Sequence, residues 1–375
     1  MTRFWVGGYG SDMGGAADGI GLLAGTEGRE PTTLAYRGAV VPAPSPSWLA
    51  QHPTLDVVYA ALEGSGEVAA FARSGESTLR PLGAPVAAGE AVCHLAVAPD
   101  GRFLVASCYG DGRVVRIGLG ADGALLPAAR DKAAEPRAAL FGDEEQGEGA
   151  DPTAAVDPYA SDPNRLDPNG DPRTTHAHSA VFLRDGRIAT ADLGYDLVRI
   201  WRPAAAGLTL DHEVVLPRGS GPRHMVAHPS GHLHVVTEYS CEVFTLAPDP
   251  EGRWGLVAGT PVSAIATPGQ DYPAELSRSR DGETLYAGVR GSNTIAALRV
   301  RGSGERLEPL ALADAGVDWP RYHLVHDGAL LVTGQRSDDL TVLDIDERTG
   351  APGGIRHRAP APAPTHLLLV RVEAL

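Results

Sequence analysis

Cysteine is scarce in this sequence of 375 residues, which contains only Cys93, Cys108 and Cys241. Their number is odd and their spacing matches no metal-binding motif, which argues against a disulfide scaffold and favours free thiols. No apolar run approaches the roughly 20 residues that a membrane-spanning helix needs. The N-terminal segment MTRFWVGGYG lacks the apolar core and the cleavage site of a signal peptide. We therefore expect a cytoplasmic protein without a membrane-spanning segment.

Basic residues are also in short supply. The chain has 32 Lys and Arg against 47 Asp and Glu, which gives a formal net charge of −15. Such a surface repels nucleic-acid phosphates and anionic lipid, so we expect no nucleic acid and no membrane among the partners. An anionic substrate then needs a locally positive pocket. Gly-X-Ser-X-Gly and His-Glu-X-X-His motifs are absent, so the sequence indicates neither a serine nucleophile nor a compact metal motif.

Glycine and proline, in contrast, are abundant, with 46 and 30 copies, as is typical of a chain that turns often. One unit recurs: a short apolar strand, a turn such as Pro99-Asp100-Gly101, a second apolar strand, a polar loop and a third strand. In each copy one residue, here called the anchor, lies where the first strand begins. The six anchors are Trp48, His94, His178, His224, Glu275 and Tyr322. Successive anchors are 46 to 51 residues apart, except for one gap of 84 residues. A period of about 40 to 50 residues with three or four strands is typical of a β-propeller blade.

The gap of 84 residues contains one blade and a polar insertion at about 135–172, which is rich in Asp-Pro and Pro-Asn steps. Two segments remain at the ends of the chain. The C-terminal APTHLLLV resembles a first strand, and the N-terminal RFWVGGYG and GIGLLAG resemble the later strands of a blade. Joined together they form a seventh blade with His366 as its anchor.

The sequence therefore predicts an all-β, seven-bladed β-propeller, closed by a composite blade from the N- and C-terminal strands. Closure removes the exposed sheet edges that invite aggregation. We expect one domain over residues 1–375, interrupted by the polar insertion, and a monomer.

A second column of residues follows 13 to 15 positions after the anchors. It consists of Glu63, Tyr109, Asp192, Glu238, Arg290 and Gln335. Because each hairpin returns the chain to its starting end, we expect both columns on one face of the disc, near the central channel. His176, Arg223 and Arg321 flank the anchors there. Imidazole, guanidinium and carboxylate groups on one rim indicate a functional site, although strand ends beside a wet channel are polar in any propeller.

At these residues the chain resembles the bacterial lactonase family of seven-bladed propellers, typified by the propeller-type 6-phosphogluconolactonases. The resemblance spans nearly the whole chain, in the family's order and blade spacing. The matching segments are HAHS at 176–179, DLGYD at 192–196, GPRH at 221–224, HPSG at 228–231, Glu238, AEL at 274–276, VRG at 289–291, PR at 320–321 and Gln335. The family has Asn where this chain has Thr237, Val289, Gly334 and Cys108. Asn at such positions braces loops, because its side chain bonds nearby backbone.

The resemblance implies a lactone hydrolase that opens a sugar-acid or other small-molecule anionic lactone without a cofactor or metal. Hydrolysis needs an activated water, a donor for the oxyanion and groups that position the substrate. No covalent nucleophile stands out, so we predict direct attack by water. The predicted catalytic residues are His178, His224, Glu238 and Glu275. The predicted substrate-binding residues are His176, Asp192, Arg223, Arg290, Arg321 and Gln335.

Other functions remain open on the sequence alone. A muconate-type cycloisomerase would use the same arginines and histidines for ring closure. A zinc ion would accept a set made of His176, His178, Asp192, His224 and Glu238. Calcium is an alternative for the oxygen-rich run Asp162, Asn164, Asp167, Asn169 and Asp171 in the insertion. A propeller that only binds a ligand or a protein is the non-enzymatic alternative.

Overall fold

Strands account for nearly all the regular structure. The computed structural model describes residues 2–25, 33–127, 166, 170, 172–205 and 207–371. In this part of the chain the only helix is one 3-10 turn, η1 (Ser11–Met13), and no helix has the length and hydropathy needed to cross a bilayer. Most of the predicted insertion at 135–172 lies outside the described residues, and so do all five residues of the calcium alternative.

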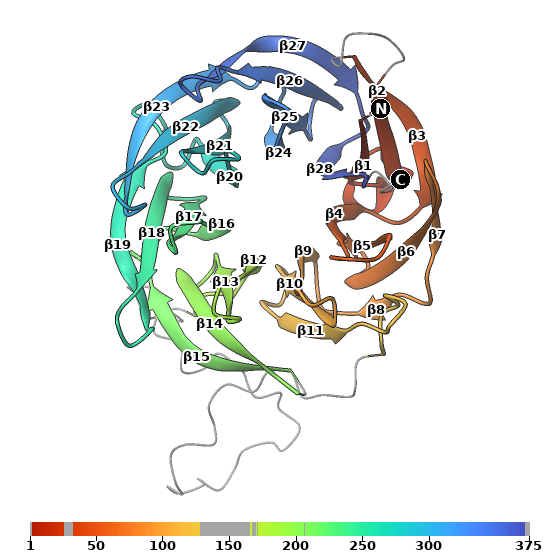
Figure 1. Ribbon diagram of the computed structural model, residues 1–375, viewed down its shortest axis with the longest axis horizontal. Helices are drawn as coiled ribbons and strands as arrows, with labels where there is room; N and C mark the ends of the chain where they lie inside the picture. The colour runs from red at the N-terminus through yellow and green to blue at the C-terminus, as the bar shows by residue number, and fades with distance from the viewer. Residues whose placement is uncertain are drawn as a thin grey trace, which may run out of the picture.

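The strands form seven antiparallel sheets that are arranged as blades around a central axis (Figure 1). This confirms the predicted all-β, seven-bladed propeller. The first complete sheet along the chain contains β4 (Pro46–Gln51), β5 (Val57–Leu62), β6 (Glu67–Gly75) and β7 (Thr78–Pro81), with β8 (Val86–Ala87) paired to β6. The next two sheets contain β9 (Val92–Val97), β10 (Phe103–Cys108) and β11 (Val114–Gly118), then β12 (Ala177–Phe182), β13 (Ile188–Asp192), β14 (Leu197–Ala204) and β15 (Gly207–Val215).

The remaining complete sheets continue in the same order. One contains β16 (Pro222–Ala227), β17 (Leu233–Thr237), β18 (Glu242–Pro248) and β19 (Trp254–Pro261). The following one contains β20 (Tyr272–Arg278), β21 (Thr284–Arg290), β22 (Thr294–Arg301) and β23 (Arg306–Asp314). The last of them contains β24 (Pro320–His326), β25 (Ala329–Gly334), β26 (Asp339–Ile345) and β27 (Pro352–Pro360).

The two ends of the chain close the ring in one sheet, as predicted. Its strand order is β28 (Pro364–Leu369), β1 (Arg3–Gly8), β2 (Gly19–Gly25) and β3 (Leu34–Pro42). His366 of β28 pairs with Gly7 of β1, and Figure 1 shows these two strands side by side. A Cβ on Gly7 would lie 2.4 Å from the carbonyl oxygen of Pro46. The closing contact with the neighbouring blade therefore requires glycine at this position.

The second strand of each blade is sandwiched between the neighbouring blades. Every residue of β5, β10, β21 and β25 is buried. The sequence of such a strand is a continuous apolar run and does not alternate between apolar and polar residues, because both faces of the strand are packed. Apolar clusters accordingly join adjacent blades, and one of them combines Tyr59 and Val68 of one sheet with Leu104 and Ile117 of the next. Burial between blades is thus the main stabilising contribution.

Each innermost strand also carries a register shift at or beside its anchor. The shift inserts an extra residue opposite the second strand, which is a β-bulge. In β16 it lets both Arg223 and His224 reach groups of the central channel, and in β24 it does the same for Arg321 and Tyr322. The repeated bulge therefore increases the number of side chains that each blade contributes to the site.

Candidate active site

Anchors from different blades meet on the axis and form an aromatic and imidazole floor. The ring centroid of Trp48 lies 4.3 Å from that of His94 and 4.1 Å from that of His366. His224 and Tyr322 complete this contact set, with centroids 5.3 Å and 5.5 Å from Trp48. All these side chains except Trp48 are at least nine-tenths buried. The seven-blade repeat thus places side chains that are far apart in sequence at one point.

A carboxyl and an imidazole lie together at the edge of the floor. Glu275 Oε1 is 3.3 Å from His224 Nδ1, and both side chains are buried. Burial raises the pKa of Glu275 well above its usual value, although Arg223 opposes the shift. Burial also lowers the pKa of His224 well below its usual value, and His94 and Arg223 add to this. Burial therefore favours the protonated acid at Glu275 and the neutral imidazole at His224.

His178 is a second neutral imidazole in the channel. Burial, and then the charges of Arg223 and Arg321, lower its pKa well below the usual value. Its Nδ1 is buried and has no hydrogen-bond partner among the described residues. A buried ring nitrogen without a partner is costly, so this atom is available to a ligand or a water.

Two arginines hold one carboxylate beside the floor. Glu238 Oε2 lies 2.9 Å from Arg223 Nε and 2.7 Å from Arg290 Nη2. Arg290 Nε also donates to the carbonyl oxygen of Tyr272 at 2.8 Å. Burial by itself would raise the pKa of Glu238, but Arg290 and Arg223 outweigh it and the pKa is lowered. Glu238 is therefore ionised. Burial lowers the pKa of Arg290 to about 10, so it keeps its charge at neutral pH.

The third arginine belongs to a second ionic group. Arg321 Nη2 lies 3.9 Å from Glu63 Oε2, and its Nη1 donates to Gln335 Oε1 at 3.4 Å. Tyr9 donates its hydroxyl to both oxygens of Glu63 at 3.1 Å. The sequence did not single out Tyr9. It directly follows β1, the second strand of the composite blade, just as Glu63 directly follows β5. Continuing the second column into the composite blade would have found it. The three arginines and two glutamates leave one excess positive charge.

Comparison with known proteins agrees with this architecture. A family model described as "Lactonase, 7-bladed beta-propeller" matches residues 3–369. The chain belongs to this lactonase family. It is 25% identical over 366 residues to a 6-phosphogluconolactonase of Bacillus subtilis, covering 93% of each chain. It is 27% identical over 297 residues to an uncharacterized protein of Lactococcus lactis, covering 76% of each. The fold is similar to that of a periplasmic gluconolactonase from Pseudomonas aeruginosa, with a TM-score of 0.79, 21% identity and 99% coverage of both chains.

One residue predicted to bind substrate has a different environment in this lactonase-family propeller. The Asp192 carboxylate is fully buried inside its blade. Its oxygens accept hydrogen bonds from Thr175 Oγ1, from Arg199 Nη1 at 2.6 Å, and from the backbone N–H groups of His176 and Tyr195 at 3.0 Å each. These bonds leave it no surface for a ligand. We correct the prediction: Asp192 positions the segment that carries His176 and His178.

Asp196, at the end of the same DLGYD segment, has a similar positioning role towards the next blade. It is fully buried, and it accepts hydrogen bonds from the N–H groups of Gly219 at 2.8 Å and Gly221 at 2.7 Å. Arg173 Nη2 lies 2.8 Å from Oδ2, the oxygen that also accepts from Gly219. The loop that these bonds fix leads directly into Arg223 and His224. The motif that carried the family resemblance is therefore largely a clamp between blades.

His176 lies at the rim rather than on the floor. Its Nδ1 is 2.6 Å from the carbonyl oxygen of Tyr109, and the two rings stack with centroids 4.3 Å apart. One ring nitrogen is thus occupied by protein. No three His, Cys, Asp or Glu side chains of the described residues converge as ligands for a metal ion, and Asp192 is unavailable. The structure therefore gives no support to the zinc alternative.

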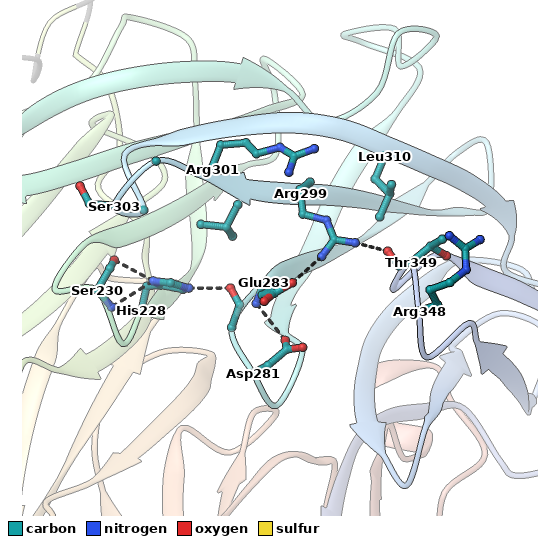
Figure 2. Close-up of a pocket in the computed structure, with 14 residues that line it drawn as sticks. His228, Ser230, Asp281, Glu283, Arg299, Arg301, Ser303, Leu310, Arg348 and Thr349 are labelled. Carbon is teal, nitrogen blue, oxygen red and sulfur yellow. Dashed lines mark hydrogen bonds and ion pairs between the residues drawn. The ribbon is translucent and has the colours of Figure 1, made fainter.

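A large open groove lies elsewhere in the molecule. Its volume is about 750 Å³, and Figure 2 shows its lining around Asp281, Glu283, Arg299 and His228. Arg299 Nη1 lies 3.1 Å from Glu283 Oε2, and His228 Nε2 lies 2.7 Å from the carbonyl oxygen of Gly282. Because β20 runs from the central site to the turn that lines the groove, the groove belongs to the opposite face. Most of its charged side chains are exposed, so the central cluster of buried titratable groups is the stronger candidate.

Proposed function

We propose that this chain hydrolyses a small anionic lactone in the central channel by direct attack of water. The observation that carries the proposal is the juxtaposition of a neutral acid–imidazole pair, Glu275 and His224, with a cluster that has an excess positive charge. The family membership and the name of the Bacillus subtilis relative support lactone hydrolysis. A sugar-acid lactone, phosphorylated or not, is the substrate class that we favour.

The arginines have two tasks in this proposal. Arg290 and Arg321 come from different blades and can hold an anionic substituent of the substrate through forked N–H donors. Arg223 lies between the ionised Glu238 and the floor, where its charge stabilises the oxyanion that develops at the lactone carbonyl. Glu238 keeps the guanidiniums of Arg223 and Arg290 in place. In this proposal Glu238 is therefore a positioning residue rather than one of the catalytic residues.

The proton transfers use the neutral pair. Water attacks the carbonyl carbon, and its proton passes to the imidazole of His224. The bond between the carbonyl carbon and the ring oxygen then breaks, and Glu275 gives its proton to the departing oxygen. His224 returns the acquired proton to Glu275 across the 3.3 Å that separates them, and the product leaves as an open-chain hydroxy acid. His178 lies in the same channel and orients the attacking water.

A panel of substrates tests the proposal. Purified protein is assayed by pH-stat titration with 6-phosphogluconolactone, the neutral gluconolactone and a muconate. We expect acceleration over spontaneous hydrolysis for the lactones, with the higher kcat/KM for the anionic one. The Glu275→Gln variant should lose this acceleration. Turnover of the muconate alone would identify a cycloisomerase instead, and no turnover of any compound would remove the enzymatic proposal.

A further inference from the structure

The position three residues before each anchor belongs to no motif, and it can be compared across the seven blades. Three residues before the anchor, the seven blades carry Ser45, Ala91, Thr175, Gly221, Tyr272, Trp319 and Ala363. At five of these positions the backbone has a positive φ, and the values are 36°, 50°, 64°, 63° and 38° for Ser45, Ala91, Gly221, Trp319 and Ala363. Four of those five residues are small.

Trp319 departs from this pattern. A bulky side chain in the left-handed region is strained, because its Cβ crowds the backbone. Such outliers persist where surrounding contacts fix them, and they concentrate at functional sites. Here the Trp319 N–H donates to Asn293 Oδ1 at 2.9 Å, and the carbonyl oxygen of Trp319 accepts from the N–H of Gln335 at 3.2 Å. The same slot in four other blades accommodates a small residue, so the fold itself does not require an indole.

The indole lies beside the arginine that closes the charged cluster. The Cζ of Arg290 is 5.2 Å from the ring centroid of Trp319, and that of Arg336 is 3.5 Å away. Tyr272 is the only other aromatic residue at this position of the repeat, and its ring centroid lies 6.1 Å from that of Trp319. Tyr272 and Trp319 therefore come from adjacent blades and lie on either side of Arg290.

We propose that Trp319 is a positioning residue that fixes the guanidinium of Arg290 for the anionic group of the substrate, and so sets a preference for anionic over neutral lactones. The inference rests on the proposed function. Its physical basis is the attraction between a guanidinium and an aromatic ring, which strengthens when the cation is removed from water. Arg290 is buried. Glu238 and Tyr272 hold two of its nitrogens, and Trp319 restrains the plane of the group.

Three substitutions of Trp319 separate the ring from the backbone. Trp319→Ala should raise KM for 6-phosphogluconolactone about tenfold, the effect expected for a lost partly buried cation–aromatic contact, and leave kcat within about twofold. KM for neutral gluconolactone should not change. Trp319→Phe retains an aromatic face and should restore KM to within about threefold of wild type. Equal losses with both lactones, or no rescue by phenylalanine, would overturn the inference.

Stability measurements distinguish a positioning role from a structural one. Trp319→Gly should unfold at a higher temperature than Trp319→Ala, since glycine adopts a positive φ without strain, and both should share the raised KM. Ala91→Gly is the matched control at the same slot of another blade, and it should gain stability with KM unchanged. If Trp319 were only structural, its variants would lose stability and keep the KM of wild type.

A binding measurement keeps this test separate from the proposed function. Calorimetric titration with 6-phosphogluconate reports anion binding without turnover. Binding that weakens about tenfold in Trp319→Ala would support the inference even if the wild-type protein hydrolysed no lactone, and the proposed function alone would then fail. Hydrolysis by wild type with the same affinity in both proteins would overturn the inference alone.

Discussion

Two buried glutamates that lie in one channel have pKa values shifted in opposite directions, and their neighbours explain the difference. Glu238 has two guanidinium groups within 3 Å of one oxygen, so it is ionised. Glu275 has a neutral imidazole as its contact, and burial raises its pKa and so favours the protonated form. Divergent environments for two similar groups are how a site obtains an acid and a charged acceptor at the same pH. Residue type alone would have treated the two carboxyls as equivalent.

The Glu275→Gln variant tests whether Glu275 is the general acid. Glu275→Gln keeps the shape but cannot transfer a proton, so kcat should fall about 100-fold or more, as for loss of a general acid. KM should change little. In wild type the acid form is present below the raised pKa of Glu275, and kcat should therefore decline as the pH rises through it. Glu283→Gln, on the exposed groove of the opposite face, is the matched control, and similar rates for both variants would contradict the assignment.

Arg290 should act mainly on binding. Arg290→Ala removes charge-assisted hydrogen bonds to an anion, each worth about 1.5 to 3 kcal/mol, so KM for an anionic lactone should rise about 10- to 100-fold. Steady-state kinetics with 6-phosphogluconolactone measure this effect. Arg301→Ala removes an exposed guanidinium paired with Glu308, and its kinetics should match wild type. An unchanged KM in Arg290→Ala would mean that the anion binds elsewhere.

At the scale of strands, the repeat was sufficient to predict the blades, their composite closure and the end of each strand that faces the site. Spacing does not report side-chain direction, which is why Asp192 was placed in the pocket. Asp192 and Glu238 follow their anchors by the same 14 residues. The first, however, meets the buried Arg199 within its own sheet, while the second meets Arg290 of the next blade. That choice depends on partners in other strands, which no local pattern encodes.

The positions where family members have Asn illustrate the same limit. Thr237 replaces one of them, and its Oγ1 accepts from the N–H of Glu242 at 3.0 Å and lies 2.8 Å from Ser240 Oγ. Thr237 therefore braces the turn as the sequence analysis expected of Asn. At Gly334 a Cβ would lie 2.2 Å from Ser337 Oγ, so the serine hydroxyl occupies the space beside the glycine. The residue at each of these positions is explained by its contacts in the folded structure, which the sequence does not show.

The closing strand β28 provides a prediction at the level of the element. Leu367 is 1% exposed and Leu369 is 41% exposed on the same strand. Leu367→Ala should lower the free energy of unfolding by about 2 to 5 kcal/mol, since it removes buried methyl groups and leaves a cavity. Leu369→Ala should change it by about 0.5 kcal/mol or less. Urea denaturation followed by tryptophan fluorescence measures both, and equal effects would show that β28 is not part of the core.

For the whole molecule, the net charge and the site have opposite signs. A surface of net charge −15 surrounds a cluster of three arginines and two glutamates with one excess positive charge. The imidazoles of the floor beneath that cluster add no charge at neutral pH, because burial lowers their pKa values. An anion therefore finds favourable charge in the channel, and selectivity for the site does not require a basic protein. Because so many imidazoles are neutral in the folded state, the free energy of unfolding depends on pH.

Acidification should destabilise the protein well before its carboxylates titrate. Burial lowers the pKa of His94 and His234 to about 3 and that of His323 to about 4, and it shifts His178, His224 and His366 downward as well. An unfolded histidine binds its proton below about pH 6.5. Between that pH and the folded values the unfolded state holds more protons, so the free energy of unfolding falls as the pH falls, by up to about 1.4 kcal/mol per pH unit for each histidine.

Among the described residues Glu275 is the one carboxyl with a raised pKa. Its effect has the opposite sign, because its folded state holds the extra proton and loses stability as the pH rises. Six imidazoles outweigh it. We expect the urea midpoint to decrease steeply from pH 7 to pH 4. His234→Asn removes one buried imidazole whose Nδ1 lies 3.1 Å from Thr245 Oγ1, away from the central site, and it should flatten this dependence. A midpoint that stays constant between pH 7 and pH 4 would mean that these histidines are not held neutral by burial.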